Sequence, residues 1–102
     1  MSKHTAGPWR YEVCDAEINA RVYGKRREFV AEVWSGKARI MEVVKANAHL
    51  IAVAPDLLNT AEQLLSLIDR YVSIGQIKFH KASAVGKQVK AARRAILKAT
   101  HP

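Results

Sequence analysis

The stretch "NAHLIAVAPDLLNTAEQLLSLID", residues 47–69, decides how the second half of this chain folds. It reads as one long apolar helix until Pro55 interrupts it. Inside a helix, Pro55 would remove the hydrogen bond to the carbonyl of Ile51 and clash there, at a cost of about 3 kcal/mol or more. At the first position of a new helix it loses nothing, and Asp56 beside it suits the positive end of the helix dipole. We therefore predict a corner between two helices rather than one kinked helix.

The segment after the corner carries a full helical stripe of apolar residues, which predicts an amphipathic helix. The stripe comprises Leu57, Leu58, Ala61, Leu64, Leu65, Ile68, Tyr71 and Val72. Gly75 is predicted to be the C-cap of this helix. Before the corner, residues 39–54 are apolar on most sides, which predicts a helix buried on more than one side.

The first 34 residues alternate between apolar and polar side chains, as strands do. The alternating stretches are "WRYEVC" (9–14), "INARVYG" (18–24) and "EFVAEVW" (28–34). In the third stretch, Phe29, Ala31 and Val33 are predicted to share the packed face. The link "GKRRE" (24–28) is polar and short enough for a hairpin. These signals predict an antiparallel meander with one packed face and one partly wet face.

A third helix is predicted from about residue 82 to 99, because an apolar stripe returns there. The stripe comprises Val85, Val89, Ala92, Ile96 and Ala99. Residues 76–83 fit either a short strand or a loop. The predicted fold class is α+β, a three-stranded antiparallel meander followed by three helices. We predict one domain over residues 1–102, with the meander in 1–35, a two-helix segment in 38–74 and a basic C-terminal helix in 81–100.

The charge of the chain is concentrated near its C-terminus. Its 102 residues carry a net charge of +8. Residues 1–70 hold ten Lys or Arg against nine Asp or Glu, whereas residues 71–102 hold seven Lys or Arg and no acid. Such a block attracts polyanions: nucleic acid, an acidic protein face or an anionic membrane.

The third helix gathers much of this charge on one face. At 100° per residue its cations Lys87, Lys90, Arg94 and Lys98 lie within about 80° of one another, opposite the apolar stripe. A solvated helix face is the ordinary explanation, but such faces usually mix charges of both signs. The residues predicted to bind nucleic acid or an acidic partner are Lys87, Lys90, Arg94, Lys98 and Arg93 on the helix, with Lys25, Arg26 and Arg27 at the hairpin tip.

The kind of partner follows from what accompanies these cations. The basic helix face carries no aromatic residue, Asn or Gln, so sequence-independent contact with phosphates is expected rather than base reading. A membrane-surface helix would carry Trp, Phe or Leu opposite its lysines, so no membrane partner is expected. The apolar surface of the first two helices is generous for 102 residues, which favours a homodimer over a monomer.

We do not expect an enzyme, a metal site or a cofactor. The four histidines, His4, His49, His80 and His101, lack the spacing of a helical metal pair, and the single Cys14 adds little to a zinc site. An enzyme acting through Cys14 or His80 is the least favoured hypothesis. One cysteine fits a reducing compartment, and the sequence shows neither a signal peptide nor an apolar run of about 18–20 residues. We expect a cytoplasmic protein.

Two motifs resemble a widespread set of small phage and prophage proteins. They are "HTAGPW" (4–9) and "ANAHLIAVAPDLL" (46–58), which resemble a recurring His-Thr-x-Gly-Pro-Trp and a later Asn-Ala-x-Leu-Ile-Ala-x-Ala-Pro-x-Leu-Leu. The resemblance implies a phage accessory protein, a class that includes inhibitors of host defence. Both motifs look structural, and the resemblance does not extend to the basic tail.

Two functional hypotheses remain. The first is non-enzymatic binding to nucleic acid, or to a host nucleoprotein complex, through the basic C-terminal helix in the host cytoplasm. The second is an anti-defence inhibitor, similar in manner to anti-CRISPR proteins, that docks on an acidic face of a host immune protein and blocks it by occupancy.

Overall fold

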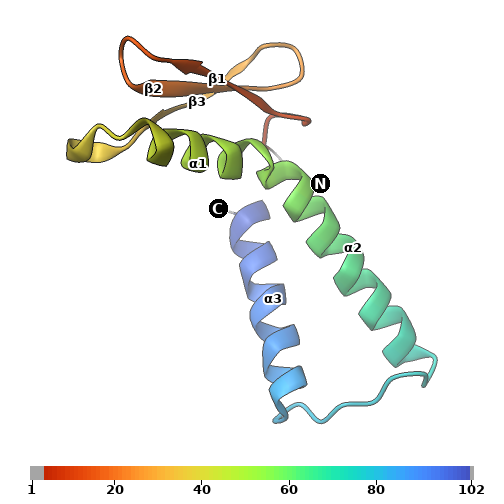
Figure 1. The fold of residues 1–102 in the computed structure, drawn as a ribbon. Coiled ribbons are helices and arrows are strands. Elements are labelled where there is room, and N and C mark those ends of the chain that lie inside the picture. Colours follow the sequence, from red (N-terminus) through yellow and green to blue (C-terminus); the bar gives the residue numbers. More distant parts are fainter. Residues whose placement is uncertain (1–3, 102) are drawn as a thin grey trace. The chain divides into compact units, whose positions relative to one another are not determined.

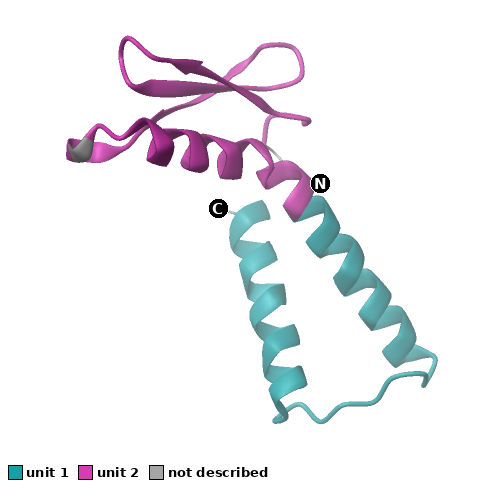
Figure 2. Ribbon diagram, in the orientation of Figure 1, with its two compact units in different colours: residues 1–3, 58–102 teal, residues 4–57 magenta. Residues whose placement is uncertain are grey.

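The computed structural model describes residues 4–101 and has the predicted α+β class, a three-stranded antiparallel sheet followed by three helices (Figure 1). The elements are β1 (Arg10–Cys14), β2 (Asn19–Tyr23), β3 (Phe29–Trp34), the short 3-10 helix η1 (Gly36–Ala38), α1 (Met41–Ala52), α2 (Ala54–Ser73) and α3 (Ala84–Thr100). The chain divides into two compact units, which we call the sheet unit (His4–Leu57) and the hairpin unit (Leu58 onward) (Figure 2). The single domain over 1–102 therefore stays a prediction, and its extreme ends lie outside the described residues.

The sheet has the order β1-β2-β3, and a bulge changes the faces of its last strand. Val22 of β2 pairs with Ala31, but the next residue of β2, Tyr23, pairs with Phe29, so Val30 is an extra residue in β3. Phe29 was predicted on the packed face, and this prediction is wrong: its side chain is 60% exposed, and Val30 packs against the core instead. A bulge reverses the alternation of side chains beyond it, and alternation alone does not reveal it.

The core of the sheet unit lies between one face of the sheet and α1. Its buried members are Ala20, Val22, Val33, Val44, Ala48 and Ala52. The expectation that the first helix is buried on more than one side is not met within the described residues, because Val43 and Leu50 on α1 are 41% and 61% exposed. Small residues at Ala48 and Ala52 let α1 approach the sheet closely.

As predicted, one helix ends and another begins near Pro55: α1 ends at Ala52 and α2 begins at Ala54. Val53 is the C-cap of α1, with its amide bonded to the carbonyl of His49, and Pro55 is the second residue of α2. Because Pro55 lies in the first turn of α2, its missing N–H leaves no hydrogen bond of that helix unmade. Helical bonding resumes with the amide of Leu57, which donates to Val53.

The two motifs that resemble phage proteins meet in the sheet unit. A Cβ atom added to Gly7 would lie 3.1 Å from Cβ of Pro55, so the N-terminal segment passes directly against the start of α2. Trp9 secures this segment by donating from Nε1 to the carbonyl of Thr5 over 2.9 Å. His4 packs edge-on against the same ring. Both motifs are therefore structural in this fold.

The hairpin unit consists of the rest of α2, a loop and α3, which runs back antiparallel to α2 (Figure 1). Gly75 follows the end of α2 with a φ of 78° and donates to the carbonyl of Val72, as predicted for a C-cap. Residues 76–83 form a loop rather than a strand. No residue of α2 is fully buried, whereas α3 buries Gly86 and Val89.

Candidate nucleic-acid interface

The basic face of α3, by which we mean Lys87, Lys90, Arg94 and Lys98, lies opposite the apolar stripe of the helix. All four side chains are exposed, and of the buried residues Val89 lies on another face whereas Gly86 lies about 40° from Lys90. The helix has no acidic residue in its first turn. The structure therefore displays four cations along one outer surface of the hairpin unit.

Arg93 was predicted with this group, and the structure gives it a different environment. Its guanidinium forms a two-pronged ion pair with Asp69 of α2, in which Nη1 donates to Oδ2 over 2.9 Å and Nη2 donates to Oδ1. This hydrogen bonding lowers the pKa of the Asp69 carboxyl and raises that of Arg93. Arg93 links the two helices, and its charge is largely compensated.

The cations of the basic face have no such partner within residues 4–101. The ion pairs among these residues are Arg21 with Glu32, Arg27 with Glu12, and Arg93 with Asp69. None of them includes a member of the basic face. Their charge remains available to an external anion.

A compact turn precedes α3 and fixes the residues beside its N-terminus. Ser83 is the N-cap: its hydroxyl oxygen accepts from the amide of Gly86 over 3.1 Å, and its O–H donates to the carbonyl of His80 over 2.6 Å. A Cβ atom on Gly86 would lie 2.4 Å from that carbonyl oxygen and 2.7 Å from the carbonyl oxygen of Lys81. Only glycine allows this approach, which holds Lys81 against the first turn of α3.

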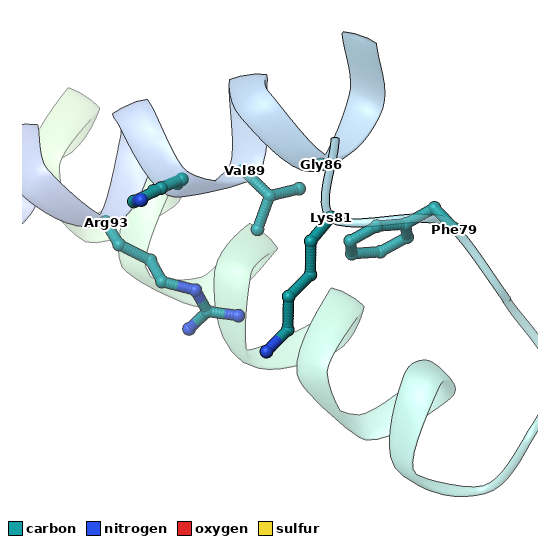
Figure 3. A pocket seen from close by; sticks show the side chains of 6 residues that line it. Phe79, Lys81, Gly86, Val89 and Arg93 are labelled. Carbon is teal, nitrogen blue, oxygen red and sulfur yellow. The ribbon is translucent and has the colours of Figure 1, made fainter. Parts of the chain in front are cut away.

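A hollow of about 370 Å³ opens beside this turn, entirely within the hairpin unit (Figure 3). Its lining residues are Phe79, Lys81, Gly86, Val89, Lys90 and Arg93. Lys81 and Lys90 both line this hollow, so the turn places a further cation near one member of the basic face. The positive end of the α3 dipole lies at the same end of the helix.

The second predicted cluster, at the tip between β2 and β3, is only partly available. Arg27 donates to Oε1 of Glu12 over 2.9 Å, and its guanidinium carbon lies 4.8 Å from the centre of the Tyr23 ring. The pair with Glu12 raises the pKa of Arg27. Lys25 and Arg26 are exposed at the tip. This cluster belongs to the sheet unit and the basic face to the hairpin unit, so the two stay separate candidates.

The structure also shows where the disfavoured catalytic candidates lie. Cys14 ends β1 in the sheet unit and is half-buried, whereas His80 belongs to the hairpin unit. Nδ1 of His80 accepts from the amide of Ala82 over 3.0 Å, which gives the ring a role in the turn. In the part of the chain that the structure describes, no three His, Cys, Asp or Glu side chains gather as metal ligands would. None of the described helices combines the length and the apolarity that crossing a membrane requires.

Comparison with known families supplies the remaining evidence of kinship. The family model described as Salmonella phage P22 protein Y8K6 matches residues 1–101. The chain belongs to this phage protein family. No curated protein and no solved structure matches the chain. Membership confirms a small phage protein family, as the two motifs indicated, whereas the finer sequence pattern stays a prediction.

Sequence reasoning missed Lys81 and the ion-pair partner of Arg93. Helical geometry could have separated Arg93 from the group: at 100° per residue it lies about 100° from Arg94 and therefore outside the basic face. No comparable signal existed for Lys81, since its position depends on the loop conformation that Gly86 permits.

Proposed function

We propose that this member of the phage family is a non-enzymatic accessory protein that binds nucleic acid phosphates through the basic face of α3. The observation that carries the proposal is the exposure of Lys87, Lys90, Arg94 and Lys98 on one side of a helix, with no acidic partner among residues 4–101. Counterions released from the nucleic acid would supply most of the affinity.

The arrangement is unfavourable for α3 itself, which supports an external role. Lys90 and Arg94 are four residues apart, as are Arg94 and Lys98, and like charges at this spacing destabilise a helix by about 0.2–0.5 kcal/mol per pair. Lys87 also lies in the N-terminal part of the helix, where the dipole disfavours cations. A bound polyanion would remove both penalties at once.

The dimensions of the basic face suit a nucleic-acid backbone. Lys87 and Lys98 are eleven residues apart, so the face is about 16 Å long. One strand of a duplex presents about five phosphates over that axial distance. The side chains of the face are three lysines and one arginine, with no Asn, Gln or aromatic residue among them. Sequence-independent contact is the expected mode, in the cytoplasm of the host cell.

The test is a fluorescence-anisotropy titration of random-sequence duplex DNA at low and moderate salt. We expect micromolar binding that weakens with salt and is lost in Lys90→Glu/Arg94→Glu. The matched control is Lys25→Glu/Arg26→Glu, which changes the net charge equally but lies at the hairpin tip of the sheet unit. Absence of binding at low salt overturns the proposal, and so does a loss confined to the hairpin-tip variant.

A further inference from the structure

The hairpin unit has an apolar seam along α2 whose side chains stay exposed beside the other residues of that unit. Leu64, Leu67 and Tyr71 of α2, with Ile74 directly after its last residue, follow one another at three, four and three residues, the spacing of a coiled-coil seam. Their side chains are 56%, 47%, 41% and 60% exposed. They lie beside a second stripe, the half-buried Leu58, Ala61, Leu65 and Ile68. Within the hairpin unit, the second stripe is partly covered and the seam is roughly half exposed.

Helix geometry defines which side of the hairpin this seam occupies. On each helix, a residue can be placed by its rotation about the helix axis, measured from the apolar stripe that faces the other helix. In an antiparallel pair of right-handed helices, a rotation in the same sense on both helices leads to the same side of the pair. Asp69 and Arg93 are both rotated in one sense and meet directly on that side. The seam is rotated by about 100° in the opposite sense on α2, so it lies on the side away from the ion pair.

The same side of α3 is free of charge and built mostly from small residues. The positions rotated in that opposite sense are Ala84, Val85, Gln88, Ala91, Ala92, Ala95 and Ala99. They occupy an arc of about 120°, distinct from the basic face. Together the α2 seam and this arc form what we call the uncharged side of the hairpin.

We propose that a second copy of this chain packs against the uncharged side, so that two hairpins form a four-helix dimer. The uncharged side has large apolar side chains on α2 and small side chains, mostly alanine, on α3. In a two-fold dimer the large residues of one copy face the small residues of the other, so the surface complements itself. A chain with a net charge of +8 meets its own copy most easily on a surface without cations.

The size of the surface agrees with this occupant. The part of α2 in the hairpin unit (58–73) and α3 are about 24 and 25 Å long and about 10 Å wide, so this side covers roughly 490 Å² in projection. Accessible area exceeds projected area because side chains protrude. A standard stable interface buries roughly 800 Å² of accessible surface per partner, and the protruding side chains are expected to supply the difference. An acidic host protein would be drawn to the basic face instead.

The test measures the mass of the full-length protein by sedimentation over a concentration series, with folding checked by circular dichroism. The chain provides a matched pair of variants: Leu64 and Leu97 are both 56% exposed in helices of the same hairpin, but Leu97 lies toward the ion-pair side. We expect a wild-type mass of twice 11.4 kDa and a dimer for Leu97→Lys. Leu64→Lys should weaken dimerisation by about a hundredfold or more, because it places a cation in the centre of the interface.

A third variant, Ala95→Lys, tests the α3 half of the surface in a position where the substitution is exposed and keeps helix propensity. It should also yield monomers. A wild-type monomer at about 100 µM overturns the proposal, because a standard interface binds more tightly than that. Equal effects of Leu64→Lys and Leu97→Lys also overturn it, since added charge alone would then explain both. The proposed nucleic-acid binding is independent of this result.

Discussion

Arg93 and Arg94 are adjacent in sequence, yet the structure predicts opposite consequences for their loss. Arg93 is paired with Asp69, whereas Arg94 belongs to the basic face. Replacing either by Gln lowers the net charge of the chain by the same amount. Only Arg94→Gln removes a cation that is available to a phosphate. The two variants therefore separate a specific surface from an effect of total charge.

The magnitude follows from the four cations of the basic face. If each neutralises one phosphate, the slope of log affinity against log salt is about −3.6 for duplex DNA, so a fourfold rise in salt lowers affinity about 150-fold. Arg94→Gln reduces the slope to about −2.7, and the same rise in salt then lowers affinity about 40-fold. Arg93→Gln should leave the slope of the wild type unchanged.

The assay is fluorescence anisotropy with a labelled random-sequence duplex over a salt series, with circular dichroism to verify that each variant keeps its helices. The reasoning is refuted if Arg93→Gln flattens the slope as much as Arg94→Gln does. It is also refuted if Arg94→Gln leaves the slope at the wild-type value. Either result would place the contacts away from the basic face.

Three further predictions concern the fold and the turn before α3. Val44→Ala should reduce the free energy of unfolding by about 2 kcal/mol in chemical denaturation, because the side chain is fully buried, whereas Val43→Ala next to it, at a site 41% exposed, should change it little. Gly86→Ala should expose the turn before α3 to faster amide hydrogen exchange, because the added methyl meets a carbonyl oxygen at 2.4 Å. The Asp69 carboxyl should titrate below its ordinary pKa of 3.8 by NMR and return toward that value in Arg93→Gln. Since folding lowers this pKa, the ion pair contributes above about pH 4 and is lost as the pH falls through the lowered pKa.

The sequence predicted the structure correctly where the backbone chemistry of a single residue decides the conformation. Pro55 could not continue a helix cheaply, so a change of helix there followed from backbone chemistry alone. Gly75 likewise ends α2 because only glycine adopts a positive φ without strain. The side of the sheet on which Phe29 lies could not be predicted from a local rule. It depends on a single extra residue in β3, and alternation predicts the opposite face until the pairing with β2 is known.

The candidate interface was predictable to the extent that it depends on one helix. Periodicity alone places Lys87, Lys90 and Arg94 on a common face. The pairing of Arg93 depends on an acid 24 residues earlier on another helix, and no local pattern specifies that α3 returns alongside α2 so that the two side chains meet. A count of charges along the chain treats Arg93 and Arg94 alike, and only the structure separates them.

The two proposed surfaces respond to salt in opposite ways, and this follows from how α3 segregates its side chains. Contacts between the basic face and phosphates weaken as salt rises, because each released counterion gains less entropy when it enters a more concentrated salt solution. The uncharged side contains no charge pair to screen, and salt reduces the long-range repulsion between two chains of charge +8. Raising salt should therefore release DNA while the dimer persists or strengthens, which sedimentation with a labelled duplex would record in one experiment. If both associations weakened together with salt, the dimer would depend on charged contacts, and the uncharged side would not be its interface.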